Sequence, residues 1–150
     1  MPGKITLEVV KGQLGVTRFS FGERTILIIG KSEDCHIRVP AEERYKMISR
    51  RHCLLDIHPP YIRARDLGSL DGTYVNDTLI GRRAKHQTPE EGSRGNFKEH
   101  DLKDGDELRF GAIPHNNPKE WQISLRVGVS IPVYSAKCGV EILESEKSQI

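Results

Sequence analysis

Four consecutive residues, Ser49-Arg50-Arg51-His52, carry side chains that suit the binding of an anion. A serine hydroxyl can donate a hydrogen bond, and each arginine offers a planar, fork-shaped cation that matches the oxygen atoms of a phosphate. A second segment, Asp66 to Asn76, closes a strand-like run with turns centred on glycine. Two such loops side by side, completed by neighbouring backbone N–H groups, would form a phosphate cradle. Neither segment places a nucleophile beside a base, so the pattern indicates binding and not catalysis.

The charge balance of the chain restricts any anion binding to a local site. The 150 residues carry a formal net charge of +2 at pH 7, far from the basic stripe that is typical of nucleic-acid binders. Hydrophobic residues make up 36% and charged residues 29%, values that fit one soluble domain with its own core. No apolar run reaches the roughly 18 residues of a membrane span. We therefore expect neither a nucleic acid nor a membrane as a partner.

Cysteine usage and the start of the chain favour a cytoplasmic protein. The three cysteines, Cys35, Cys53 and Cys138, form an odd set without the spacing of a disulfide framework, which suits a reducing compartment. The first residues lead directly into a strand pattern and not into the apolar region of a signal peptide. Cys35-His36 with Cys53 or His58 matches no common zinc spacing, so we predict no metal site and no cofactor.

Short apolar runs separated by turns predict about ten strands. The expected strand segments are residues 5–10, 16–21, 25–29, 36–39, 52–58, 61–67, 78–80, 107–110 and 121–127. Thr25 to Ile29 is continuously apolar, which predicts a central strand covered on both faces. Residues 41–48 are expected to form a loop with room for one helical turn. Asp71-Gly72 is a strong signal for a hairpin turn.

Two parts of the chain lack this strand pattern. Residues 82–101 are charged and small without apolar periodicity, which predicts a long surface loop inserted between strands. Beyond Val129 the pattern fades, so residues 130–150 are expected to form a tail or linker, with a helix over residues 141–146. Residues 1–129 predict an all-β domain, a two-sheet antiparallel β-sandwich that gathers its functional loops at one end.

These segments resemble the sequence landmarks of the forkhead-associated (FHA) domain family. The family has a Gly-Arg pair at the end of a strand, then a Ser-x-x-His, then a segment close to Gly-Ser-x-Asn-Gly-Thr-x-Val-Asn. This chain has Gly30-Lys31, Ser49-Arg50-Arg51-His52 and Gly68-Ser69-Leu70-Asp71-Gly72-Thr73-Tyr74-Val75-Asn76 in the same order. Leu102 to Gly111 resembles the penultimate hairpin of the family. Each motif alone is weak evidence for the family, but four motifs in the same order are specific to it.

The resemblance implies an eleven-stranded sandwich of the FHA/SMAD type that binds phosphothreonine peptides through loops at one apex. It implies that Ser49 donates a hydrogen bond to the phosphate, and that Arg50 contacts the phosphate or the peptide. Lys31, Leu70 and Asp71 occupy the other positions at which the family contacts the phosphopeptide. Four further residues match positions that brace the loops without touching the ligand: Gly30, His52, Gly72 and Asn76.

Three of these residues differ from the family pattern in ways that change the chemistry. Lys31 stands where the family has arginine, so a bidentate fork becomes a point charge. Asp71 replaces asparagine, which removes a donor and places a carboxylate near an incoming dianion. This replacement either weakens binding or favours a basic residue after the phosphothreonine. The side chain of Leu70 cannot donate a hydrogen bond to phosphate at all.

The inserted segment, notably Gln87 to Gly92, is similar to that of FHA domains that precede the catalytic domain of some bacterial multidomain Ser/Thr kinases. No kinase signature occurs in these residues, so a catalytic domain of the same protein would begin beyond Ile150. Arg82-Arg83 and Lys85 most simply keep the segment hydrated, or add a basic rim to a peptide site.

The sequence therefore predicts a non-catalytic module of Ser/Thr phosphorylation signalling that recognises phosphothreonine-containing proteins or peptides. Lys31, Leu70 and Asp71 leave an alternative open: a protein-interaction sandwich whose phosphate site has degenerated and whose binding ignores phosphorylation. His52 is predicted to be a hydrogen-bonded structural residue, because no activated nucleophile accompanies it.

Overall fold

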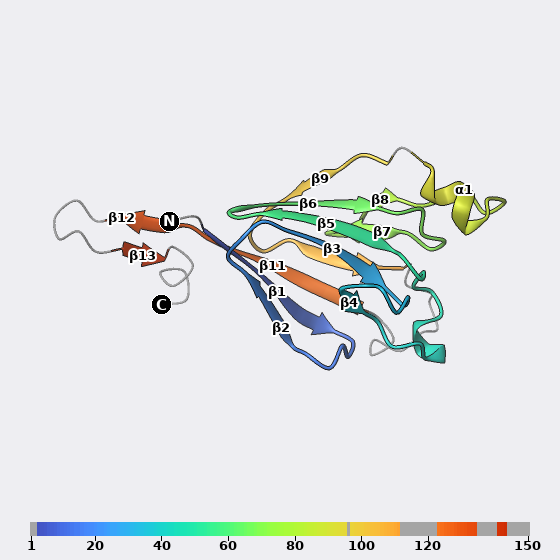
Figure 1. Ribbon diagram of the computed structural model, residues 1–150, viewed down its shortest axis with the longest axis horizontal. Coiled ribbons are helices and arrows are strands. Elements are labelled where there is room, and N and C mark those ends of the chain that lie inside the picture. Colours follow the sequence, from blue (N-terminus) through green and yellow to red (C-terminus); the bar gives the residue numbers. More distant parts are fainter. Residues whose placement is uncertain (1–2, 96, 112–122, 135–140, 144–150) are drawn as a thin grey trace.

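The computed structural model describes residues 3–95, 97–111, 123–134 and 141–143, and shows two stacked β-sheets (Figure 1). The first sheet has six strands, in the spatial order β2 (Arg18–Phe21), β1 (Lys4–Lys11), β11 (Ile123–Ser130), β10 (Glu107–Phe110), β7 (Thr73–Val75) and β8 (Thr78–Gly81). The second has five, in the order β4 (Ile37–Arg38), β3 (Thr25–Gly30), β5 (Cys53–His58), β6 (Tyr61–Asp66) and β9 (His100–Leu102). The prediction of an all-β sandwich with about eleven strands is confirmed.

The two sheets pack together because alternate side chains of their strands face a shared core. In β1, Ile5 and Leu7 are fully buried between more exposed neighbours, and in β5 Leu55 and Ile57 repeat the pattern. Residues of both sheets join in one hydrophobic cluster. Burying one large aliphatic side chain contributes about 1.5–3 kcal/mol, and a one-residue slip would expose the whole set. The alternation therefore fixes the register of each strand.

The surroundings of β3 differ from the prediction of a strand covered on both faces. Leu27 and Ile29 are buried in the core, but Ile26 is 50% exposed on the outer face. Asp56, the partner of Ile26 on β5, and Arg63 on β6 continue that face with charged side chains. β3 also pairs in parallel with β4, whereas its pairing with β5 is antiparallel as predicted. A continuous apolar run therefore does not by itself show that both faces of a strand are covered.

The connection from β6 to β7 crosses between the sheets and does not form the predicted hairpin. Asp71-Gly72 lies in this connection, but β6 belongs to the five-stranded sheet and β7 to the six-stranded sheet. β7 pairs instead with β8 through the turn Asn76-Asp77, whose φ angles of 48° and 68° suit a two-residue hairpin. The crossing brings Leu70 against Ser49, in the chain that enters β5.

The inserted segment is more structured than the loop predicted over residues 82–101. It contains the helix α1 (Pro89–Ser93), and its last two residues belong to β9. The helix begins with a capping box, in which the Thr88 hydroxyl accepts from the Glu91 N–H at 3.2 Å and the Glu91 carboxylate accepts from the Thr88 N–H at 3.1 Å. The prediction missed α1 because five residues are too few to show helical periodicity.

Two short strands after β11 pair with each other, in the part of the chain that was expected to form a tail or linker. β12 (Pro132–Tyr134) pairs antiparallel with β13 (Glu141–Leu143). The predicted helix over residues 141–146 is wrong for residues 141–143, and residues 144–146 lie outside the described part of the chain. The predicted strand start at residues 121–122 and Cys138 also lie outside it.

The loops that carry the candidate residues gather at the end of the sandwich opposite the β12–β13 pair (Figure 1). That end also holds α1 and the 3-10 helix η1 (Glu43–Tyr45), a single turn within the loop predicted over residues 41–48. Tyr45 is buried, and its hydroxyl accepts from the Gln13 N–H at 3.0 Å, which ties η1 to the chain that follows β1. Neither helix of the described residues is long enough to cross a membrane.

Candidate functional site

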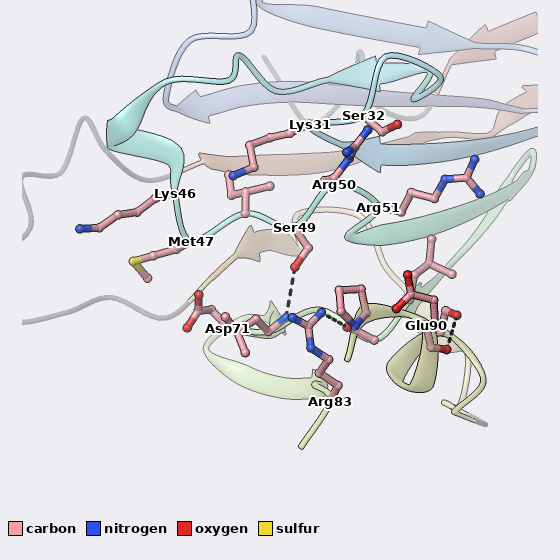
Figure 2. A pocket seen from close by; sticks show the side chains of 16 residues that line it. Lys31, Ser32, Lys46, Met47, Ser49, Arg50, Arg51, Asp71, Arg83 and Glu90 are labelled. Atoms are coloured by element: carbon pink, nitrogen blue, oxygen red, sulfur yellow. Dashed lines mark hydrogen bonds between the residues drawn. The ribbon is translucent and has the colours of Figure 1, made fainter. Parts of the chain in front are cut away.

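The structure brings the five residues predicted to contact a ligand to one pocket. Lys31, Ser49, Arg50, Leu70 and Asp71 all line a cavity of about 680 Å³. Figure 2 shows Ser49 in the middle, with Lys31 and Arg50 on one side and Asp71 on the other. The residues come from three loops, namely β3–β4, the chain that enters β5, and the β6–β7 crossing.

Backbone hydrogen bonds join the first two of these loops. The Lys31 N–H donates to the Ser49 carbonyl at 3.2 Å, and the Ser32 N–H donates to the Arg50 carbonyl at 2.9 Å. Gly30 permits this approach, because a Cβ at that position would overlap the Arg50 carbonyl. The predicted phosphate cradle of backbone N–H groups therefore cannot draw on Lys31 or Ser32 unless these bonds break.

Ser49 connects the second loop to the third. Its Oγ accepts a hydrogen bond from the Leu70 N–H at 3.1 Å. Because the hydroxyl oxygen is the acceptor in this bond, its hydrogen can be donated to a ligand oxygen in the pocket. The Leu70 side chain is 42% exposed and has no polar atom, so Leu70 contributes its backbone N–H to the site and no side-chain donor.

His52 lies behind the pocket and holds the same two loops together. It is fully buried, and its Nδ1 accepts from the Ser49 N–H at 3.1 Å. The proton is therefore on Nε2, which donates to the Gly72 carbonyl at 2.7 Å. The ring packs edge-on against Phe110, with the ring centroids 5.4 Å apart. Burial lowers the pKa of His52, which keeps the imidazole neutral near pH 7 and preserves both bonds.

The lowered pKa of His52 predicts a loss of stability in mild acid. The unfolded chain takes up this proton at the ordinary pKa of about 6.5, before the folded protein does. The contribution of His52 to the free energy of unfolding is therefore complete above about pH 6.5 and declines as the pH falls below that value. Urea unfolding between pH 5 and 8 measures the decline. In the variant His52→Ala this fall in the free energy of unfolding at low pH should disappear. In His58→Ala, which removes an exposed histidine, the fall should remain. Equal slopes in the two variants would contradict the assignment.

Asp66 organises the third loop, although it was not among the predicted site residues. The buried carboxylate accepts hydrogen bonds from the Gly68 and Ser69 N–H groups, both at 2.9 Å. It also accepts from the hydroxyls of Ser69 at 2.6 Å and Thr73 at 2.7 Å. An aspartate followed at two and three residues by Gly and Ser is a turn signal that could have revealed this role. The conformation of the loop that lines the pocket thus depends on one carboxylate.

Gly72 and Asn76, the other two residues predicted to brace loops, flank β7 at its two ends. Gly72 has a φ of 96°, which favours glycine, and its carbonyl accepts from the Gly111 N–H as well as from the imidazole described above. Asn76 does not line the pocket. Its side chain donates to Asp106 at 2.8 Å and accepts from the Glu107 N–H at 2.9 Å. Asn76 therefore fixes the start of β10 and not the pocket loops.

The pocket carries more cations than carboxylates. Asp71 and Glu90 face five basic residues, which are Lys31, Lys46, Arg50, Arg51 and Arg83. Arg51 forms an ion pair with Asp34, and Figure 2 shows its side chain directed away from Ser49. The excess of positive charge suits a dianionic group, but Arg51 is already committed to a carboxylate of the protein.

Several residues that line the pocket were not predicted as site residues, namely Lys46, Met47, Arg83, Pro89, Glu90 and Ser93. The last four come from the inserted segment, and of the two arginines considered for a basic rim only Arg83 lines the cavity. The sequence Thr88-Pro89-Glu90-Glu91 has the form of a capping box and could have revealed α1. No sequence signal places that helix beside the β6–β7 crossing.

Comparisons with known proteins agree with this architecture. The sequence matches the FHA domain over residues 27–111, more than half of the chain. An FHA domain from a structural and functional analysis of phosphothreonine-dependent FHA domain interactions has 23% identity and a TM-score of 0.56, and the match covers 84% of this chain and 96% of that chain. The N-terminal FHA domain of Rad53p from S. cerevisiae, solved in complex with a phosphothreonine peptide, has 13% identity and a TM-score of 0.56, with coverage of 86% and 94%.

A third similar structure is the FHA domain of the CT664 protein from Chlamydia trachomatis. It has 16% identity and a TM-score of 0.56, and the match covers 83% of this chain and 96% of that chain. A search of curated proteins gave no match. At these identities the solved structures establish the fold, while the sequence match over residues 27–111 establishes the family. The chain belongs to the FHA domain family.

Proposed function

We propose that this FHA domain binds phosphothreonine-containing proteins or peptides at the pocket lined by Ser49. The observation that carries the proposal is the meeting of Lys31, Ser49 and Arg50 around one cavity. A phosphothreonine carries roughly −1.5 to −2 charge near neutral pH and three strong acceptor oxygens. A hydroxyl donor with two cations matches that group better than it matches a neutral side chain. The phosphothreonine peptide bound by the Rad53p domain supports the same class of ligand for this chain.

In this proposal each side chain supplies a different part of the interaction. Ser49 donates from a hydroxyl whose oxygen is held by the Leu70 N–H. Lys31 supplies a point charge, and Arg50 supplies a guanidinium that can bond two oxygens at once. Asp71 lines the same pocket and repels a dianion, so it favours ligands with a basic residue after the phosphothreonine.

The variant Ser49→Ala tests the proposal. Loss of a hydrogen bond to a charged group should weaken phosphopeptide binding by about 1.5–3 kcal/mol, with little change in the free energy of unfolding. Calorimetric titration with matched phosphorylated and unphosphorylated threonine peptides measures the effect. The control Ser20→Ala, on an exposed position of β2, should bind like the unchanged protein. Equal affinities of the original protein and Ser49→Ala for both peptides would refute the proposal.

Leu70 and Asp71 favour a second candidate function, a protein-interaction sandwich that ignores phosphorylation. One side chain cannot donate to a phosphate and the other repels it, although both line the pocket. A screen of degenerate threonine peptides in phosphorylated and unphosphorylated form separates the two functions. Selection of peptides only when phosphorylated supports the first function, and equal selection of both forms supports the second.

Within the proposal, the domain is a non-catalytic module of Ser/Thr phosphorylation signalling in the cytoplasm, and it needs no cofactor or nucleic acid. Cys35 and Cys53 are buried free thiols, which suits a reducing compartment. The similarity of the inserted segment to that of kinase-associated FHA domains supports a kinase domain elsewhere in the same protein. Phosphorylation of substrate by the purified natural protein, compared with residues 1–150 alone, tests that part.

A further inference from the structure

Three cations of the pocket have no carboxylate partner among the residues that the structure describes: Lys31, Arg50 and Arg83. The other two cations are engaged, because Arg51 pairs with Asp34 and the Lys46 ammonium lies 3.6 Å from the Glu43 carboxylate. Lys31 and Arg50 already have a role in the proposed function. Arg83 has none, and it comes from the segment that is inserted between β8 and β9.

Arg83 is fixed to the loop that crosses from β6 to β7. Its N–H donates to the Ser69 carbonyl at 2.8 Å, and its Nη1 donates to the Gly68 carbonyl at 3.0 Å. Gly92 of α1 packs on the stem of Arg83, since a Cβ at Gly92 would come within 2.8 Å of Arg83 Cδ. Figure 2 shows Arg83 on the side of the pocket across from Lys31. The inserted segment therefore holds one guanidinium at a defined place in the pocket wall.

The guanidinium of Arg83 retains hydrogen-bonding capacity for a ligand. Nη1 donates to the Gly68 carbonyl and Nε is buried, whereas Nη2 has no acceptor among the described residues and is not buried. An oxyanion that enters the pocket can accept a charge-assisted hydrogen bond from Nη2, whereas Nε is shielded from the ligand by the protein. The need for such a donor is local, because Leu70 and Asp71 on the adjoining loop supply no side-chain donor to a phosphate.

We propose that Arg83 is a further phosphate-binding residue of this domain, supplied by the inserted segment in place of the donors that Leu70 and Asp71 lack. The inference rests on the proposed phosphothreonine binding at the same pocket. Lys31 and Arg50 then approach the phosphate from one side and Arg83 from the other. The three cations neutralise the dianion and offset the repulsion from Asp71.

The test compares Arg83→Met with Arg82→Met, which removes the same charge from the adjacent exposed arginine outside the pocket. The probe is the tightest-binding phosphothreonine peptide of the degenerate screen, with its unphosphorylated twin. We expect Arg83→Met to lower the affinity for the phosphorylated peptide by about 10- to 100-fold and to leave the affinity for the unphosphorylated peptide unchanged. Arg82→Met should have little effect on either affinity. A third variant, Arg83→Lys, keeps the charge and one donor to Gly68. Its affinity for the phosphorylated peptide should lie between that of Arg83→Met and that of the unchanged protein.

A direct contact between Arg83 and the phosphate can also be detected by a measurement that would not change if Arg83 had only a structural role. Removing a cation from the phosphate raises the pKa of its second ionisation, so ³¹P NMR titration of the bound peptide should show a higher pKa with Arg83→Met than with the unchanged protein. An unchanged phosphate pKa, or an equal loss of affinity for both peptides, would overturn the role of Arg83. If the unchanged protein does not distinguish the two peptides, the proposed function itself fails. Discrimination that is undiminished in folded Arg83→Met removes only this inference.

Discussion

Replacing Asp66 with alanine is expected to lower the free energy of unfolding by about 3–5 kcal/mol, more than the replacement of any other polar residue around the pocket. The carboxylate is 1% exposed and accepts from two backbone N–H groups and two hydroxyls, those of Gly68, Ser69 and Thr73. Alanine leaves these donors buried without an acceptor, and each such donor costs about 1–3 kcal/mol. Part of the loss is offset because the folded protein no longer buries a charge.

Urea unfolding monitored by far-ultraviolet circular dichroism measures the effect. The control is Asp101→Ala, which removes an exposed carboxylate that pairs with Arg63 at 2.8 Å on the surface of the five-stranded sheet. A surface ion pair contributes about 0–1 kcal/mol, so the control should remain close to the original stability. If the two variants lose the same amount, Asp66 is not the organiser of the β6–β7 crossing.

The second large effect is expected from His52→Ala, with a loss of about 2–4 kcal/mol. The substitution removes the acceptor of the Ser49 N–H and the donor to the Gly72 carbonyl, and it leaves a cavity beside Phe110. It therefore detaches the loop that carries Ser49 from the turn that precedes β7. Phosphopeptide affinity should fall together with stability, because Ser49 loses one of the hydrogen bonds that fix its position.

Hydrogen exchange distinguishes this local effect from general destabilisation. The amide of Ser49, which donates to His52 Nδ1, should lose protection in His52→Ala, whereas core amides such as that of Leu55 should follow only the global stability. His58→Ala, at the exposed end of β5, serves as the matched control and should change neither. Retained protection at Ser49 in His52→Ala would show that other contacts suffice to hold the loop.

The strands of the sandwich could be predicted because their signal is local. In β1 the alternation of Ile5 and Leu7 with polar residues shows directly which side faces the core. β3 shows the limit of this logic, because Ile26 has the same apolar character as its buried neighbours but lies on the outer face. Periodicity reports which side chains can be buried, and the number of layers decides how many are.

The pocket could be predicted in part, since its residues follow the landmarks of the FHA resemblance. Lys31, Ser49 and Arg50 belong to those landmarks and line one cavity. Arg83 could not be found in the same way, because its role depends on a contact between segments that no period connects. Asp66 lies outside those landmarks, and only its local turn with Gly68 and Ser69 could have revealed its role. The helix that follows Arg83 was missed for a different reason: it is set by its cap and not by an apolar face.

The three pocket loops are joined by hydrogen bonds within the protein itself, from Lys31 to Ser49, from Ser32 to Arg50 and from Leu70 to Ser49. A binding pocket whose loops are preorganised loses little conformational entropy when a ligand binds. Diffusional encounter and electrostatic steering therefore govern its association rate. Such a pocket also changes shape little when it is occupied, and it cannot relay a signal by distortion. We expect the domain to act as a tether, which raises the local concentration of whatever the rest of its protein carries near a phosphorylated partner.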